Sequence, residues 1–153
     1  MIQEFEKLNE WEIEVMMRTP IVVCILIAGA DGTIDKKEIK EAITITGKQA
    51  KSRYLLREYL KSVAEDLEDK IRVLKQSYPR DAKERSSVLV TELGSLNNIL
   101  PKISEPFVSE FYAMLKELAV KVASSSGGWL GLNTVGSEEE KYVDLSMIQP
   151  PSN

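Results

Sequence analysis

Apolar residues recur at helical spacing along nearly the whole chain, and this pattern constrains the fold more than any other feature. One stripe, with steps of three or four residues, runs through Leu56, Leu60, Val63, Leu67, Ile71 and Leu74. A second stripe of the same spacing runs through Phe107, Phe111, Met114, Leu118 and Val122. Such steps place side chains on one face of an α-helix, whereas a strand alternates with a period of two. The sequence therefore predicts an all-α protein.

Capping and breaking residues set the ends of the predicted helices. Asp35, Asp81 and Ser137 each stand three positions before a glutamate, the spacing of a capping box that satisfies free amides at a helix start. Thr19-Pro20 predicts an N-cap followed by proline at the first helical position. We expect seven helices, over residues 3–18, 20–30, 36–47, 52–77, 82–100, 105–125 and 137–148.

The 153 residues suit one domain, and no linker rich in Pro, Gly or Ser divides them. We expect one helical domain over residues 1–149 and a disordered tail over 150–153, with a composition that permits a monomer or a dimer. The most apolar run, Ile21–Ala30, is about half the roughly 20 residues that a membrane span needs. It therefore predicts the most buried helix of the protein and no integral membrane segment.

Composition excludes several classes of function. The chain has no histidine, which removes Ser-His and Cys-His nucleophiles and the zinc sites that use histidine ligands. Its net charge of −4 argues against nucleic-acid binding, which needs a concentrated basic face. The single cysteine, Cys24, lies in the apolar run, so we expect a buried, inert thiol in a reducing, cytoplasmic environment. These features together predict a non-enzymatic protein.

An acidic segment between the second and third predicted helices carries the most specific motif. From Asp31 it reads Asp-Gly-Thr-Ile-Asp-Lys-Lys-Glu, which matches the second half of an EF-hand loop. The first half does not match, because Ile27 and Gly29 stand where acidic ligands belong. Two interpretations remain. Asp31, Asp35 and Glu38 bind a divalent cation with oxygens from elsewhere in the fold, or the segment is a purely structural turn in which Asp35 caps the next helix.

A partial echo of this unit lies near the carboxyl end. There an apolar helix is followed by Ser126-Gly127 and, after further residues, by Ser137-x-x-Glu140. The chain resembles the tellurite-resistance TerB-like family. The resemblance rests on this echo, on the seven-helix order and on the motif Ala28-x-Ala30-Asp31-Gly32-x-Ile34-Asp35-x-x-Glu38. The second turn departs from that family, whose members often carry Asp-Gly where this chain has Ser126-Gly127.

The resemblance implies an all-α globule of two pseudo-repeated halves with acidic residues gathered on one face. It also implies a non-enzymatic role in bacterial stress or tellurite resistance, with binding or sensing of a divalent cation such as Ca²⁺ or Mg²⁺. By motif match, Asp31, Asp35 and Glu38 take the acidic-cluster role, and Glu140 takes the matching role in the second half. The alternative is an all-α module that binds other proteins through its helix faces and needs no metal.

Overall fold

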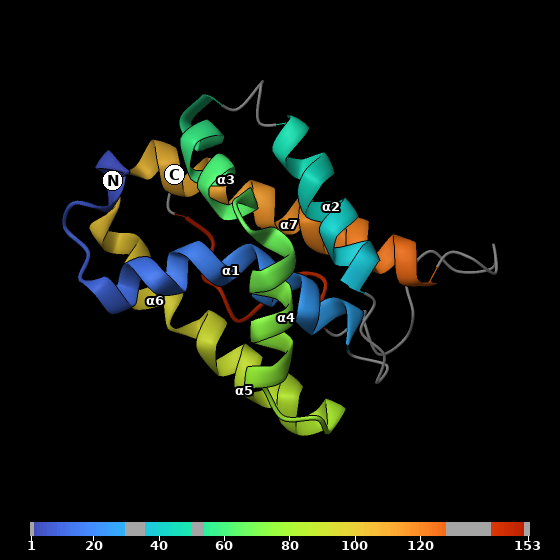
Figure 1. The fold of residues 1–153 in the computed structure, drawn as a ribbon. Helices are drawn as coiled ribbons and strands as arrows, with labels where there is room; N and C mark the ends of the chain where they lie inside the picture. Colours follow the sequence, from blue (N-terminus) through green and yellow to red (C-terminus); the bar gives the residue numbers. More distant parts are fainter. Residues whose placement is uncertain (1, 30–35, 50–53, 128–141, 152–153) are drawn as a thin grey trace.

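A computed structural model describes residues 2–29, 36–49, 54–127 and 142–151, and every regular element in these ranges is helical (Figure 1). The prediction of an all-α domain is therefore confirmed. The elements are η1 (Gln3–Phe5), α1 (Glu10–Ala28), α2 (Lys36–Gln49), η2 (Tyr54–Leu56), α3 (Arg57–Ala64), α4 (Leu67–Ser77), α5 (Ala82–Gly94), α6 (Leu96–Ile99), η3 (Leu100–Lys102) and α7 (Glu105–Gly127), where η marks a 3₁₀ turn. None of these helices is long and apolar enough to cross a membrane.

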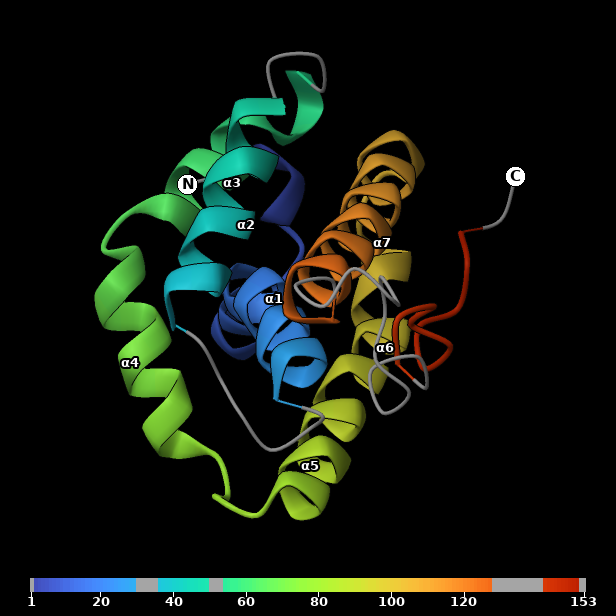
Figure 2. The same ribbon diagram turned by 90° about the vertical axis from the view of Figure 1, so that its right-hand side faces the viewer.

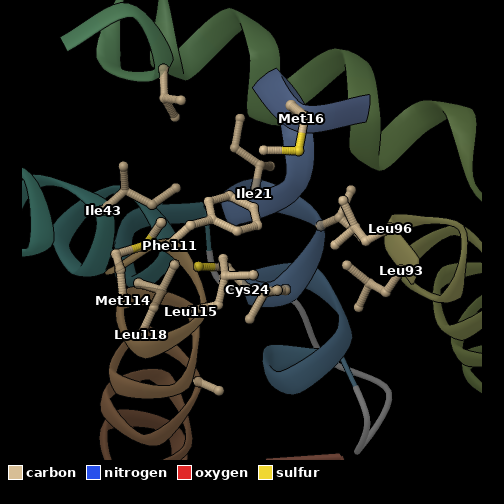
Figure 3. Packing of buried hydrophobic residues seen from close by; sticks show 14 of the residues in the cluster. Met16, Ile21, Cys24, Ile43, Leu93, Leu96, Phe111, Met114, Leu115 and Leu118 are labelled. Carbon is tan, nitrogen blue, oxygen red and sulfur yellow. The ribbon is translucent and has the colours of Figure 1, made fainter. Parts of the chain in front are cut away.

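Helix α1 runs through the middle of the protein, and the other helices surround it (Figures 1 and 2). Residues Ile21–Ala28 are each at most 3 % exposed, so the prediction that this run is the most buried element is confirmed. Figure 3 shows Met16, Ile21 and Cys24 of α1 packed among side chains of α2, α5, α6 and α7. Burying each large apolar side chain contributes about 1.5–3 kcal/mol, which makes this packing the main source of stability.

The prediction of a helix over residues 3–18 is wrong, because the chain breaks at Asn9. The Asn9 side chain accepts a hydrogen bond from the Glu12 amide (2.8 Å), and the Glu12 carboxylate accepts one from the Asn9 amide (3.0 Å). This complete capping box starts α1 at Glu10. The Asn-x-x-Glu spacing was visible in the sequence, but the apolar stripe through Phe5 and Leu8 obscured the break.

The prediction that a new helix starts at Pro20 is also wrong, because α1 passes through this residue without interruption. Proline has no amide proton, so the carbonyl four residues earlier, that of Met16, loses its helical partner. The buried Tyr59 hydroxyl of α3 donates a hydrogen bond to this same carbonyl (2.5 Å). Thr19 is not an N-cap, since its hydroxyl donates to the Val15 carbonyl within the helix (2.6 Å). A tertiary contact thus replaces the bond that Pro20 removes.

The long helix predicted over residues 52–77 is divided into α3 and α4. Asp66 between them has φ +51°, a left-handed conformation that ends a helix and that aspartate tolerates better than most residues. The Lys70 ammonium donates to the Ser62 carbonyl (2.9 Å) and so satisfies the end of α3. The turn lets α4 pack against both α1 and α2. A straight helix would leave its apolar stripe without these neighbours.

Two further predicted helices differ from the structure. The helix over 82–100 ends at Gly94 and continues as the separate turns α6 and η3. Residues 142–148, the described part of the helix predicted over 137–148, form turns instead. Leu145 has φ +52°, which a right-handed helix excludes, and the Asp144 carboxylate accepts a hydrogen bond from the Ser146 amide (3.2 Å). The expected pseudo-repeat depends mostly on residues 128–141, which lie outside the described ranges.

Candidate functional site

The helix ends that flank the acidic motif come together at one end of the protein. The last turn of α1, the first turn of α2 and the last turn of α7 lie side by side there (Figures 1 and 2). Asp31, Asp35 and Glu140 lie outside the described residues, and Glu38 is in the first turn of α2 with its side chain likewise outside the description. Elsewhere in the described chain, no group of three or more acidic or cysteine side chains could hold a metal ion. The cation site therefore stays a prediction.

Arg85, on the first turns of α5, holds the carboxyl end of α1 and was not identified from the sequence. Its side chain is 4 % exposed and donates hydrogen bonds to the carbonyls of Gly29 (2.8 Å) and Arg80 (2.9 Å). Gly29 is the C-cap of α1, where free carbonyls and the helix dipole favour a positive charge. Its position in the sequence could have indicated that it is buried, because Arg85 stands one helical turn before Leu89 on the apolar face of α5. Gly29, two positions before Asp31 of the acidic motif, is thus fixed to α5.

A second polar network joins α1, α4 and α5. The Arg18 guanidinium lies 3.0 Å from the Glu92 carboxylate, whose other oxygen accepts a hydrogen bond from the Tyr78 hydroxyl (2.9 Å). Burial, and then the neighbouring Glu92 charge, raises the pKa of Tyr78 well above its usual range. Tyr78 therefore stays a neutral donor, and this network is structural.

Glu12 and Lys102 form a third polar contact, between α1 and η3. The Lys102 ammonium donates a hydrogen bond to the Glu12 carboxylate (2.6 Å). This bond is the main cause that lowers the pKa of Glu12 below its usual range, and the hydrogen bond from the Asn9 amide lowers it further. Cys24 is buried as expected, and burial raises the pKa of its thiol. A thiol of raised pKa is a poor nucleophile, which agrees with the inert role assigned to Cys24.

A groove of about 710 Å³ lies between α2 and α3. Ile43 and Leu60 contribute apolar surface to it, and Lys48, Arg57 and Lys61 are exposed along it. No acidic side chain is among the described residues that line this groove. It is therefore a basic surface on a chain whose net charge is −4. This basic surface was not predicted from the sequence, because its cations come from two helices and are not clustered along the chain.

The chain matches no known family model, no curated protein and no solved structure. The helices and their packing around α1 define its class, a single-domain all-α protein.

Proposed function

We propose that the chain is a non-enzymatic, cytoplasmic TerB-like protein of bacterial stress or tellurite resistance that binds a divalent cation, Ca²⁺ or Mg²⁺. In this proposal Asp31, Asp35 and Glu38 supply ligands, and Glu140 supplies a further carboxylate from the second half. The lone, buried Cys24 supports the cytoplasmic location, since disulfide-free chains suit reducing compartments.

One observation carries the cation proposal, namely the meeting of the ends of α1, α2 and α7. Calcium takes about 6–8 oxygen ligands, more than one short acidic segment supplies. A site here must draw oxygens from more than one part of the chain. The motif that holds Asp31 and Asp35 lies directly between α1 and α2, and Glu140 follows α7 in the sequence. The helix arrangement therefore favours a shared site at this end of the protein.

Asp31→Asn is expected to abolish stabilisation by the cation while changing the stability of the metal-free protein little. The substitution removes a charged ligand, yet asparagine tolerates turn geometry as aspartate does. A cation that binds only the native state raises its stability by mass action, by about 2.7 kcal/mol at 100 times the dissociation constant. The measurement is calorimetric titration and thermal unfolding of both proteins with Ca²⁺ and with Mg²⁺ at moderate ionic strength.

Asp35→Ala is the comparison, because it removes a ligand and a predicted N-cap together, and the lost cap lowers the stability of the metal-free protein by roughly 0.5–2 kcal/mol with or without a cation site. If Asp31 acts only as a ligand, Asp31→Asn does not lower the stability of the metal-free protein. Equal weak heats from the wild type and Asp31→Asn would mean that the segment is purely structural. The second candidate function below would then take its place.

The second candidate is a metal-free module that binds another protein, and the basic groove between α2 and α3 favours it. Lys48, Arg57 and Lys61 line this groove with apolar surface from Ile43 and Leu60. Grooves between helices take the apolar face of an amphipathic helix, and complementary charge directs the encounter. The fitting partner is a helix with one apolar face and acidic flanks.

Lys61→Glu is expected to weaken the binding of an acidic amphipathic helical peptide about tenfold, because it places like charges opposite each other. Lys83→Glu on α5 makes the same change of charge away from the groove and is the control. The peptide is titrated into each protein by calorimetry at low and at physiological salt. Equal affinities for the two variants would show that binding follows net charge and not this groove.

A further inference from the structure

Residues 142–151, called the strap here, pack against the rest of the protein without forming a helix. Leu145 and Ile148, three positions apart, are 0 % and 1 % exposed. Figure 2 shows the strap in red beside α6 and α7. The strap's backbone–backbone hydrogen bonds that the structure describes lie within it, from Leu145 to Tyr142 (2.9 Å) and from Ile148 to Leu145 (3.0 Å). It is therefore a segment with two fully buried apolar anchors, and Tyr142, Val143 and Met147 pack beside them partly buried.

Asn97 of α6 binds the main chain of the strap on both sides of Ile148. Its side-chain amide donates to the Met147 carbonyl (2.9 Å), and its oxygen accepts a hydrogen bond from the Gln149 amide (2.8 Å). One asparagine thus satisfies a donor and an acceptor of the same short segment. Main-chain hydrogen bonds combined with burial of spaced apolar side chains are a usual way in which proteins bind peptide segments.

The strap fits this surface imperfectly. Leu145 is buried with φ +52°, a left-handed conformation that costs a residue with a Cβ atom roughly 1–2 kcal/mol. A cavity of about 400 Å³ remains beside Pro150 and Pro151, with Leu100, Ile103 and Val108 in its lining. A ligand without the strained residue, or with a larger side chain over the cavity, would gain contacts that the strap lacks.

We infer that the surface formed by α6, η3 and the start of α7 is a peptide-binding site that the chain's own strap occupies. Its ligand is a short, turn-forming segment of a partner protein with two apolar residues three positions apart, followed by proline. The strap competes with this ligand and lowers its apparent affinity. The inference does not depend on cation binding at the acidic motif or on the basic groove, and its failure would leave both untouched.

A partner protein fits this site better than a second copy of the chain does. The strap of another copy carries the same Leu145 and leaves the same cavity beside Pro150. Exchange between copies would therefore replace one occupant by an identical one with no new contact. A partner segment can avoid both defects and so displace the strap.

Gln149→Pro tests the competition, because proline removes the amide that donates to Asn97. The Gln149 side chain is exposed, so the substitution leaves the core intact, and Gln149→Ala keeps the amide as a matched control. Loss of one such bond opens the strap about fivefold more often. A fluorescent peptide with the sequence of residues 142–151 should then bind the full-length Gln149→Pro chain about fivefold more tightly than the wild type. The Gln149→Ala chain should match the wild type.

Two further measurements complete the test, both with the Gln149→Pro chain. A peptide with Leu145→Ser and Ile148→Ser should lose binding. This loss would show that the site recognises the two apolar side chains. Sedimentation should find a monomer at all concentrations. The inference is overturned if the unmodified peptide shows no saturable binding, if Gln149→Ala tightens it equally, or if a dimer forms and identifies a second copy as the occupant.

Discussion

Replacing Arg85 with methionine is expected to lower the free energy of unfolding by about 3 kcal/mol. Methionine keeps much of the apolar stem but leaves the Gly29 carbonyl, in a buried contact, and the Arg80 carbonyl, in a partly buried one, without their donor. An unsatisfied buried acceptor costs about 1–3 kcal/mol, and bonds from a charged group are the stronger ones. Chemical denaturation of both proteins, compared at equal m-value, measures the difference.

Arg80→Met is the control, because Arg80 lends only its backbone carbonyl to this contact and its own side chain is exposed. We expect it to change stability by less than about 0.5 kcal/mol, as surface substitutions usually do. Arg85→Lys should fall between the two, since a lysine reaches fewer carbonyls than the forked guanidinium. An Arg85→Met protein as stable as Arg80→Met would mean that the two carbonyls find other partners.

Arg85 also shows why part of this fold could be predicted and part could not. The long apolar stripes specify which faces of α3, α4 and α7 are buried, and that prediction is confirmed. A charged residue on such a face looks like an interruption until its acceptors are known. The carbonyl of Gly29 is distant in the sequence, and no local pattern connects it to Arg85.

Three of the boundaries that were predicted wrongly depend on more than the local sequence. Pro20, Asp66 and Leu145 each adopt a local conformation that a tertiary contact or a tight turn decides. Local rules place a helix start at Pro20 because proline is favoured at the first helical position. They place a helix through Asp66 because the apolar stripe extends across it, and one through Leu145 because the Ser137-x-x-Glu140 capping box precedes it. Packing of α4 on two helices and of the strap beside α6 and α7 overrides these preferences.

The candidate sites also divide into one that the sequence predicts and two that only the structure reveals. The acidic motif of Asp31, Asp35 and Glu38 is contiguous in the chain, so its residue types alone suggest a cation site. The basic groove and the Asn97 site are assembled from separate helices, and their residue types are common on any helix surface. Only the arrangement of the helices brings them together. A site whose residues are neighbours in the chain can therefore be predicted from the sequence. A site whose residues come from separate helices cannot.

Tyr59→Phe is expected to lower the free energy of unfolding by about 1–3 kcal/mol, the cost of an unsatisfied buried acceptor. The ring itself stays packed against Phe5, Phe107 and Phe111, so the loss comes from the hydroxyl. That hydroxyl donates to the Met16 carbonyl, which Pro20 leaves without a helical partner. Thermal and denaturant unfolding of the wild type and the variant measure the loss.

Pro20→Ala supplies the decisive comparison, because an alanine amide can donate to the Met16 carbonyl in the ordinary helical way. In the Pro20→Ala background we expect Tyr59→Phe to cost less than about 1 kcal/mol, since the carbonyl keeps one donor. The four proteins form a double-mutant cycle in which effects of Pro20→Ala on the unfolded chain cancel. An equal cost of Tyr59→Phe in both backgrounds would show that the hydroxyl does not compensate for the proline. An unequal cost would explain how α1, the most buried helix, passes through Pro20 without a break.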